Sequence, residues 1–255
     1  MTPPRPQIAR KECDRGPAPA AWAHKDVWIF DFDGTLVDSM THFTDLAERI
    51  IHEHLDVPPV RARELYRTTS GLPFIDQMEQ CFPGDARNPA AVAAFEGAKR
   101  TTYLRQPLFP DTREALEVLR DRGRQVVISS NNSQALVEAY CRTHQLPARI
   151  VCGWRPGFAK GPAHFAHIAA VSGKDPAVML FIGDSLKDAE RARVHGLDFV
   201  ARAGTFTARE FQTHFPSVPV VHSLLECVEL VSKPSRATPS ARRGGAPQPE
   251  RTRRT

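Results

Sequence analysis

Apolar and polar positions in the middle of the chain follow two alternating repeats, one typical of strands and one typical of helices. Short apolar runs predict strands at Val27–Phe30, Gln125–Ser129, Arg149–Val151, Ala177–Ile182 and Asp198–Val200. Amphipathic segments between them predict helices at Ser133–His144, Gly161–Val171 and Ser185–His195, and another that begins with Asp111 as its N-cap. This alternation predicts an α/β fold, a doubly wound, Rossmann-like parallel sheet with helices on both faces.

One long stretch interrupts the alternation, because no strand pattern appears between the first predicted strand and Gln125. Helical patterns fill it, at Phe43–His54, Val60–Thr69, Pro73–Gln80 and Ala90–Leu104. We therefore expect an all-helical cap at residues 40–106, inserted into a core formed by residues 26–39 and 107–231. Its hinges are expected near Asp38–Met40 and Gln106–Pro110. Residues 1–25 and 232–255 lack hydrophobic periodicity, and we expect them to be disordered.

Composition narrows the class of protein. Of the 255 residues, 41% are hydrophobic and 25% are charged, an ordinary globular balance. The net charge of +5 arises at the ends: residues 232–255 hold seven basic residues and one acid. This tail has no aromatic residues, so we do not expect it to bind nucleic acid. No apolar run approaches the roughly 20 residues of a membrane span, and residues 1–21 lack the apolar segment of a secretory signal.

The cysteines bear on the compartment. The chain has five, an odd number, and none forms a Cys-x-x-Cys pair. This pattern indicates neither a disulfide framework nor a zinc ribbon. We therefore expect a reducing, cytoplasmic setting.

Carboxylates follow two of the predicted strands. Asp31 and Asp33 come directly after the first strand and before Gly34, and Asp184 and Asp188 follow the run that ends at Ile182. Ligands bind at the carboxyl ends of strands in open α/β sheets, so we expect the four acids to surround one site. Burying acids together is costly unless a cation pairs them. Mg²⁺ suits a site with few carboxylates and retained water.

Groups that bind anions follow two further segments. Ser129, Ser130 and Asn131 end another apolar strand and lead into a helix, where hydroxyl and amide donors can bind an anion. A shift of one residue would let Ser130 take the role first assigned to Ser129. Lys160 stands at the start of the next helix, where an ammonium group can neutralise phosphate charge.

Taken in order, these segments resemble the motifs of the haloacid dehalogenase superfamily, in the phosphatase branch that includes phosphoglycolate phosphatases and β-phosphoglucomutases. The first motif, Asp-x-Asp-Gly-Thr, is matched by residues 31–35, and the second, a Ser or Thr ending a strand, by Ser129. The third is Lys160, here separated from the usual Pro by one residue. The fourth, Gly-Asp-x-x-x-Asp, is matched by residues 183–188, and the helical insert resembles the family's cap.

The resemblance implies a Mg²⁺-dependent phosphatase of a small phosphorylated metabolite. Asp31 would be the nucleophile that forms an aspartyl-phosphate, and Asp33 the general acid and base. Mg²⁺ would be held by the side chain of Asp31, the backbone carbonyl of Asp33 and Asp184, with Asp188 direct or through water. Phosphate oxygens would be held by Ser129, Ser130, Asn131 and Lys160. We expect a monomer or a homodimer, and, because the chain has no apolar span, no membrane partner.

Several alternatives stay open. A sugar phosphomutase shares every core motif and differs only in the acceptor of the phosphoryl group. A dehalogenase would lack Asp33, and a phosphonate hydrolase would need a cap lysine, for which the cap offers only Lys99 in a charged helix far along the insert. A non-catalytic binding protein recruited through its tail is another possibility. In the cap, Arg67 is either an ordinary solvated arginine or a contact for the distal anion of the substrate.

Overall fold

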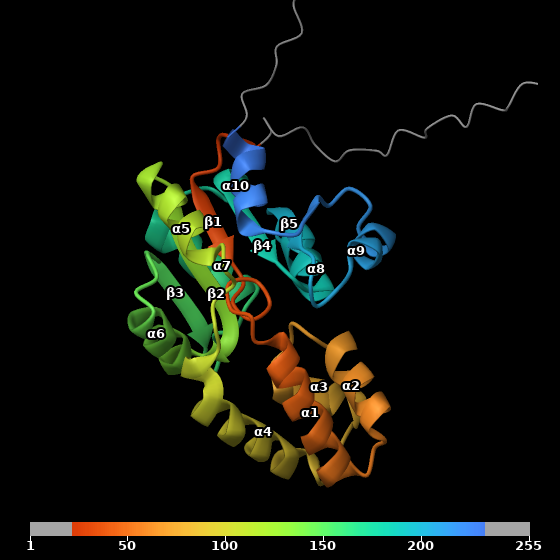
Figure 1. Ribbon diagram of the computed structural model, residues 1–255. Coiled ribbons are helices and arrows are strands. Elements are labelled where there is room, and N and C mark those ends of the chain that lie inside the picture. Colours follow the sequence, from red (N-terminus) through yellow and green to blue (C-terminus); the bar gives the residue numbers. More distant parts are fainter. Residues whose placement is uncertain (1–21, 233–255) are drawn as a thin grey trace, which may run out of the picture.

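The computed structural model describes residues 22–232, and in that part of the chain a six-stranded, all-parallel sheet forms the centre of the molecule (Figure 1). Its strand order is β3-β2-β1-β4-β5-β6. The strands are β1 (Val27–Phe30), β2 (Gln125–Ser133), β3 (Ile150–Trp154), β4 (Met179–Gly183), β5 (Asp198–Arg202) and β6 (Val220–Val221). The predicted α/β fold with a doubly wound parallel sheet is therefore confirmed.

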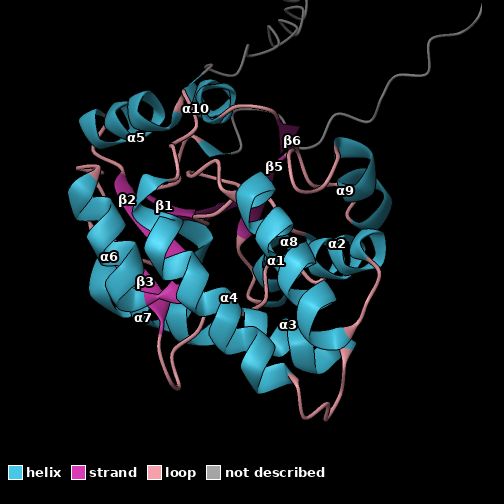
Figure 2. Cartoon of the chain, turned by 60° about the horizontal axis from the view of Figure 1, so that its bottom comes forward, coloured by secondary structure: helices cyan, strands magenta, loops and turns pink. Residues whose placement is uncertain are grey.

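The two-residue repeat of the strands divides the core into two layers. In β1, Trp28 and Phe30 pack into one hydrophobic cluster, while Val27 and Ile29 pack into the other. Helices lie on both sides of the strands (Figure 2). The first face is covered by α5 (Thr112–Asp121), α6 (Gln134–Thr143) and α10 (Leu224–Ser232), and the second by α7 (Pro162–Ser172), α8 (Leu186–Val194) and α9 (Ala208–His214).

A helical insert, defined here as α1–α4, lies between β1 and β2 beyond the end of the sheet where β1 ends (Figure 1). In α1 the buried positions Phe43, Leu46, Ala47, Ile50 and Ile51 follow the helical repeat. The insert comprises α1 (Met40–Leu55), α2 (Pro59–Thr68), α3 (Phe74–Cys81) and α4 (Asn88–Thr102), followed by the 3-10 turn η2 (Tyr103–Arg105). A second such turn, η3 (Pro176–Val178), precedes β4.

The insert leaves the core and returns to it through paired segments of chain. Val37 and Leu108 form an antiparallel bridge, and the amide of Asp38 donates to the carbonyl of Pro107 at 2.9 Å. The pairing lies where the sequence predicts the hinges. The division into a core and a cap with boundaries at residues 40 and 106 stays a prediction.

At the N-terminal side the structure differs from the expected boundary. Most of the two segments predicted to be disordered, namely residues 1–21 and 233–255, lies outside the described residues. Residues 22–25 were also expected to be disordered, but Trp22 is buried in the core. Lys25 is buried as well, where it donates to the carbonyl of Ala177 and pairs with Asp198 at 2.6 Å. The buried ring of Trp22 and the contacts of Lys25 together hold residues 22–25 against the core.

Asp111 was expected to cap the helix that follows it. It does stand at the N-cap position of α5, but its side chain makes no bond to that helix. Instead its carboxylate accepts hydrogen bonds from the backbone amides of Leu224 and Leu225 at the start of α10. The strand β6 and the helices α9 and α10 were not predicted. Among residues 22–232, no helix is both long and apolar enough to cross a bilayer.

Candidate active site

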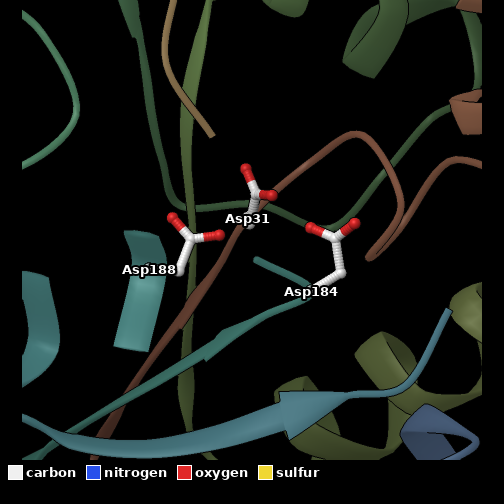
Figure 3. Close-up of side chains that lie close together, drawn as sticks. All are labelled: Asp31, Asp184 and Asp188. Carbon is white, nitrogen blue, oxygen red and sulfur yellow. The ribbon is translucent and has the colours of Figure 1, made fainter. Parts of the chain in front are cut away.

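Three aspartates meet at the carboxyl ends of the central strands. Asp31 follows β1, Asp184 follows β4, and Asp188 lies in the first turn of α8. Since β1 and β4 are paired neighbours in register, their ends bring these residues together. One oxygen from each carboxylate lies within 4.8 Å of the others, and the three side chains surround a common space (Figure 3). All three are buried.

Two cations neutralise part of this acid cluster. The Lys160 ammonium lies 2.7 Å from Oδ1 of Asp31 and 2.8 Å from Oδ1 of Asp188. Arg191 reaches the same oxygen of Asp188 at 3.4 Å. Hydroxyl groups complete the shell: Ser185 donates to Asp188 at 2.7 Å, and Thr205 donates to Asp184.

The three aspartates differ in the direction in which their pKa values are shifted. Burial raises the pKa of Asp31 to about 6. Burial, together with repulsion from Asp31 and Asp188, raises the pKa of Asp184 well above its ordinary value. Burial also disfavours ionised Asp188, but Lys160 and Arg191 outweigh it and lower its pKa. Three buried carboxylates beside one lysine and one arginine thus lack positive charge. Their oxygen donors suit a hard divalent cation such as Mg²⁺.

Gly34 is required for the approach of the two strand ends. Its backbone has φ of +77°, and a Cβ there would lie 2.0 Å from Oδ2 of Asp184. A side chain at this position would push Asp184 out of the cluster. The tight turn after Asp33 therefore depends on glycine.

Asp33 lies outside the acid cluster, in a separate hydrogen-bond network. Its Oδ1 accepts from the Ser39 hydroxyl at 2.5 Å. Its Oδ2 accepts from the Asn132 amide and, at 3.4 Å, from the Tyr103 hydroxyl. The Lys99 ammonium lies 4.0 Å from the same oxygen. Donors from the core and the insert thus hold Asp33 on the side of the site that faces the insert.

The structure separates the two neighbouring serines of the second motif. Ser130, like Lys160, lines the cavity beside Asp31, but Ser129 does not. The fully buried hydroxyl of Ser129 lies 2.9 Å from Nδ1 of His164, whose Nε2 lies 3.2 Å from the Gly153 carbonyl. Burial lowers the pKa of His164 to about 4, so the neutral ring donates through Nε2 and accepts from Ser129. The one-residue shift considered above is therefore the arrangement that the geometry favours.

The loop between α2 and α3 lies on the core. The Gly71 carbonyl accepts from the Asn131 amide at 2.7 Å and from Arg191 at 3.0 Å. Gly71 has φ of +95°, and a Cβ there would lie 2.5 Å from the Ser185 hydroxyl. Asn131, predicted to bind phosphate, thus lines the cavity but directs its amide to the insert.

Arg67 does not reach this cavity. Its guanidinium pairs with Glu210 at 2.8 Å and lies 5.3 Å from the ring centre of Phe206. It lines a separate groove that also contains Arg202. The hypothesis that Arg67 contacts the distal anion of the substrate is therefore not supported by the geometry.

Lys99 lines the cavity. The sequence indicates only that it lies in a charged helix far along the insert, which weighed against a phosphonate hydrolase. Its position four residues after Phe95 and eight after Ala91, both buried, puts it on the inner face of α4. That spacing was the signal available in the sequence. No role was predicted for Ser39 and Asn132, although they stand beside the first and second motifs. Tyr103, Thr205 and Arg191 were also missed, because none of these three belongs to a recognisable motif.

Comparisons with known proteins agree with this geometry. The model of the haloacid dehalogenase-like hydrolase family matches residues 25–196. A phosphoglycolate phosphatase from Synechococcus elongatus is 27% identical over 193 residues, covering 71% of this chain and 85% of the relative. One from Caulobacter vibrioides is 28% identical over 218 residues, covering 80% and 91%.

A solved structure supports the same fold. A haloacid dehalogenase-like family hydrolase from Streptococcus pneumoniae superposes with a TM-score of 0.68 at 21% identity, covering 81% of this chain and 98% of that chain. The family model matches more than half of the chain. The chain therefore belongs to the haloacid dehalogenase-like hydrolases.

Proposed function

We propose that the protein is a Mg²⁺-dependent phosphatase that hydrolyses a small phosphate monoester through an aspartyl-phosphate on Asp31. The observation that carries the proposal is the position of Asp31. Its carboxylate is buried against Lys160 and two further aspartates, and it lines a cavity that residues of the insert also line. A nucleophile and the cations that neutralise a phosphoryl group are thus adjacent.

The first step would transfer the phosphoryl group to the enzyme. An oxygen of Asp31 attacks phosphorus, the bond from phosphorus to the ester oxygen breaks, and Asp33 gives its proton to the leaving alcohol. In the second step Asp33 takes a proton from water. The resulting hydroxide attacks phosphorus and releases inorganic phosphate and free Asp31.

Other residues of the chain would bind the phosphoryl oxygens. Lys160 and Ser130 line the cavity beside Asp31, and we assign their ammonium and hydroxyl groups as the direct donors. Bound Mg²⁺ would supply further neutralisation of the phosphoryl charge. Its ligands would be Asp31, Asp184 and the Asp33 carbonyl, with Asp188 direct or through water.

The insert would exclude water and select the ester. Its loop at Gly71 already contacts Asn131 and Arg191 of the core, which supports a closed arrangement over the site. The relatives named phosphoglycolate phosphatase support a small, acidic ester as the substrate. The predictions of a cytoplasmic location and of a monomer or homodimer stay predictions.

The test is phosphate release from p-nitrophenyl phosphate and a panel of small esters that includes 2-phosphoglycolate, with Mg²⁺ or with EDTA. We expect Mg²⁺-dependent release that falls by about 10³-fold or more in Asp31→Asn, because the nucleophile is lost. A phosphorylated sugar isomer as product, in place of inorganic phosphate, would indicate a phosphomutase instead. A folded protein with neither activity would contradict the proposal and favour the binding protein.

A further inference from the structure

Lys99 is a buried cation in the cavity with no function assigned so far. Its side chain comes from α4, and only 8% of the residue is exposed. The ammonium lies 4.8 Å from the ring centre of Phe43, 5.6 Å from that of Tyr103 and 5.7 Å from that of Phe95. It donates a hydrogen bond to Oδ1 of Asn132. Aromatic faces and one amide oxygen therefore form its immediate surroundings.

The charge of Lys99 is only partly compensated. Lys160 is paired with both Asp31 and Asp188 at under 3 Å. Within residues 22–232, the ion pair that Lys99 makes is with Asp33 alone, at 4.0 Å, the outer limit for such a contact. Taking an ammonium out of water is costly unless an anion lies close to it. An anionic ligand in the cavity would supply that partner.

A lysine in an active site can also react with a carbonyl group to form an imine, as a phosphonate hydrolase would require. That reaction needs the lysine nitrogen to attack a carbonyl carbon. The nitrogen of Lys99 instead donates to Oδ1 of Asn132 and lies 4.8 Å from the ring centre of Phe43, contacts typical of a hydrogen-bond donor and of a cation. The surroundings of Lys99 therefore suit binding of an anion better than covalent chemistry.

We propose that Lys99 determines specificity by binding a carboxylate group on the carbon that carries the phosphate ester; this inference rests on the function proposed above. In that function Asp33 contacts the ester oxygen. The ammonium of Lys99 lies 4.0 Å from Oδ2 of Asp33. An ester oxygen bonded to Asp33 and a carboxylate bonded to Lys99, each at about 2.8 Å, would therefore lie close together, as they do when both are attached to one carbon. The substrate class is then the phosphate esters of 2-hydroxycarboxylic acids, of which 2-phosphoglycolate is the smallest.

The test compares two esters that differ only in the second anion, 2-phosphoglycolate and ethyl phosphate. We expect the wild type to prefer 2-phosphoglycolate. In Lys99→Met the ratio of the two kcat/KM values should fall about 50-fold, mainly through the KM for 2-phosphoglycolate, because a buried charge pair is lost. Lys174→Met, which removes a lysine paired with Asp26 on the outside of the core, should leave the ratio unchanged.

Binding provides a readout that does not depend on turnover. Calorimetry with Mg²⁺ would compare Asp31→Asn with the double variant Asp31→Asn/Lys99→Met. We expect the second change to weaken binding of 2-phosphoglycolate far more than binding of ethyl phosphate. If the wild type hydrolyses neither ester, the proposed function fails, and this binding comparison still decides the role of Lys99.

Three results would overturn the inference. An equal loss for both esters would mean that Lys99 acts through Asp33 on the general acid. An unchanged ratio, in a variant whose melting curve matches the wild type, would remove Lys99 from recognition. Borohydride trapping of phosphonoacetaldehyde on Lys99, detected as a mass increase of the peptide, would assign it to imine chemistry.

Discussion

The core side and the insert side of the cavity hold their charges in different ways. On the core side Asp31 and Asp188 share Lys160, and hydroxyl groups bond Asp184 and Asp188. On the insert side one ammonium group lies among aromatic rings, with its carboxylate partner at the limit of contact. The core side suits the phosphoryl group, which all esters share, and the insert side suits the part that differs among them.

Asp184→Asn removes a carboxylate from the core side of the cavity and should reduce activity more than the other changes below. Removing one charge from the proposed metal site should lower phosphate release from every ester by about 10²- to 10³-fold and raise the Mg²⁺ concentration for half-maximal activity at least tenfold. The preference for 2-phosphoglycolate over ethyl phosphate should persist in the residual activity. A titration with Mg²⁺ at saturating ester checks this.

Asp121→Asn is the control, since that exposed carboxylate pairs with the exposed Arg120 away from the cavity. An unaltered Mg²⁺ requirement in Asp184→Asn would exclude Asp184 as a ligand. Because burial raises the pKa of Asp184, the ionised group opposes folding at neutral pH. Without metal, the variant should therefore melt no lower than the metal-free wild type. A loss of activity at an unchanged melting temperature then reflects the metal site and not unfolding.

The variants Ser130→Ala and Ser129→Ala distinguish the roles of the two neighbouring serines in β2. Ser130→Ala should lower kcat/KM about 10- to 100-fold for both esters, because a hydroxyl donor to the phosphoryl group is lost. Ser129→Ala should instead leave Nδ1 of His164 without a donor and lower the free energy of unfolding by about 1 kcal/mol, with activity retained. Steady-state kinetics and urea unfolding measure the two effects. The reverse pattern would return the phosphate contact to Ser129.

Gly71→Ala tests the contact between the insert and the core and has the smallest expected effect. A Cβ at φ of +95° would meet the Ser185 hydroxyl at 2.5 Å, so the loop must shift. We expect KM to rise about 3- to 10-fold, because a displaced loop loses about 1 kcal/mol of contact energy. Gly84→Ala is the matched control, since Gly84 has φ of +67° but nothing within 4 Å of its Cβ position. Equal effects of the two variants would assign the change to backbone strain alone.

The acids could be predicted from the sequence because strand ends in a parallel sheet converge whatever the detail of the helices. Asp31 and Asp184 could be identified from the apolar runs before them, and the structure adds that β1 pairs with β4. The choice between Ser129 and Ser130 could not be made, because the register of β2 shifts after Ser129. There the two-residue repeat no longer tells which side chain faces the site.

Features that depend on tertiary packing could not be predicted from the sequence. Lys99 has the right helical spacing, but its function depends on where the far end of α4 lies, and no local pattern encodes that. The two residues of β6 are too short for a repeat to be recognised. Trp22 is buried, but it lies in a segment that was predicted to be disordered because of its many prolines. Each of these was determined by tertiary contacts.

The bridge between Val37 and Leu108 has a consequence for how such a protein can evolve. A chain that departs and returns at one point places no demand on the spacing of the strands on either side of it. The segment beyond the bridge can therefore lengthen, shorten or change its packing while β1 stays paired with β2. Selection can act on the choice of ester and on the chemistry almost independently, and one hydrolytic centre can serve many metabolites.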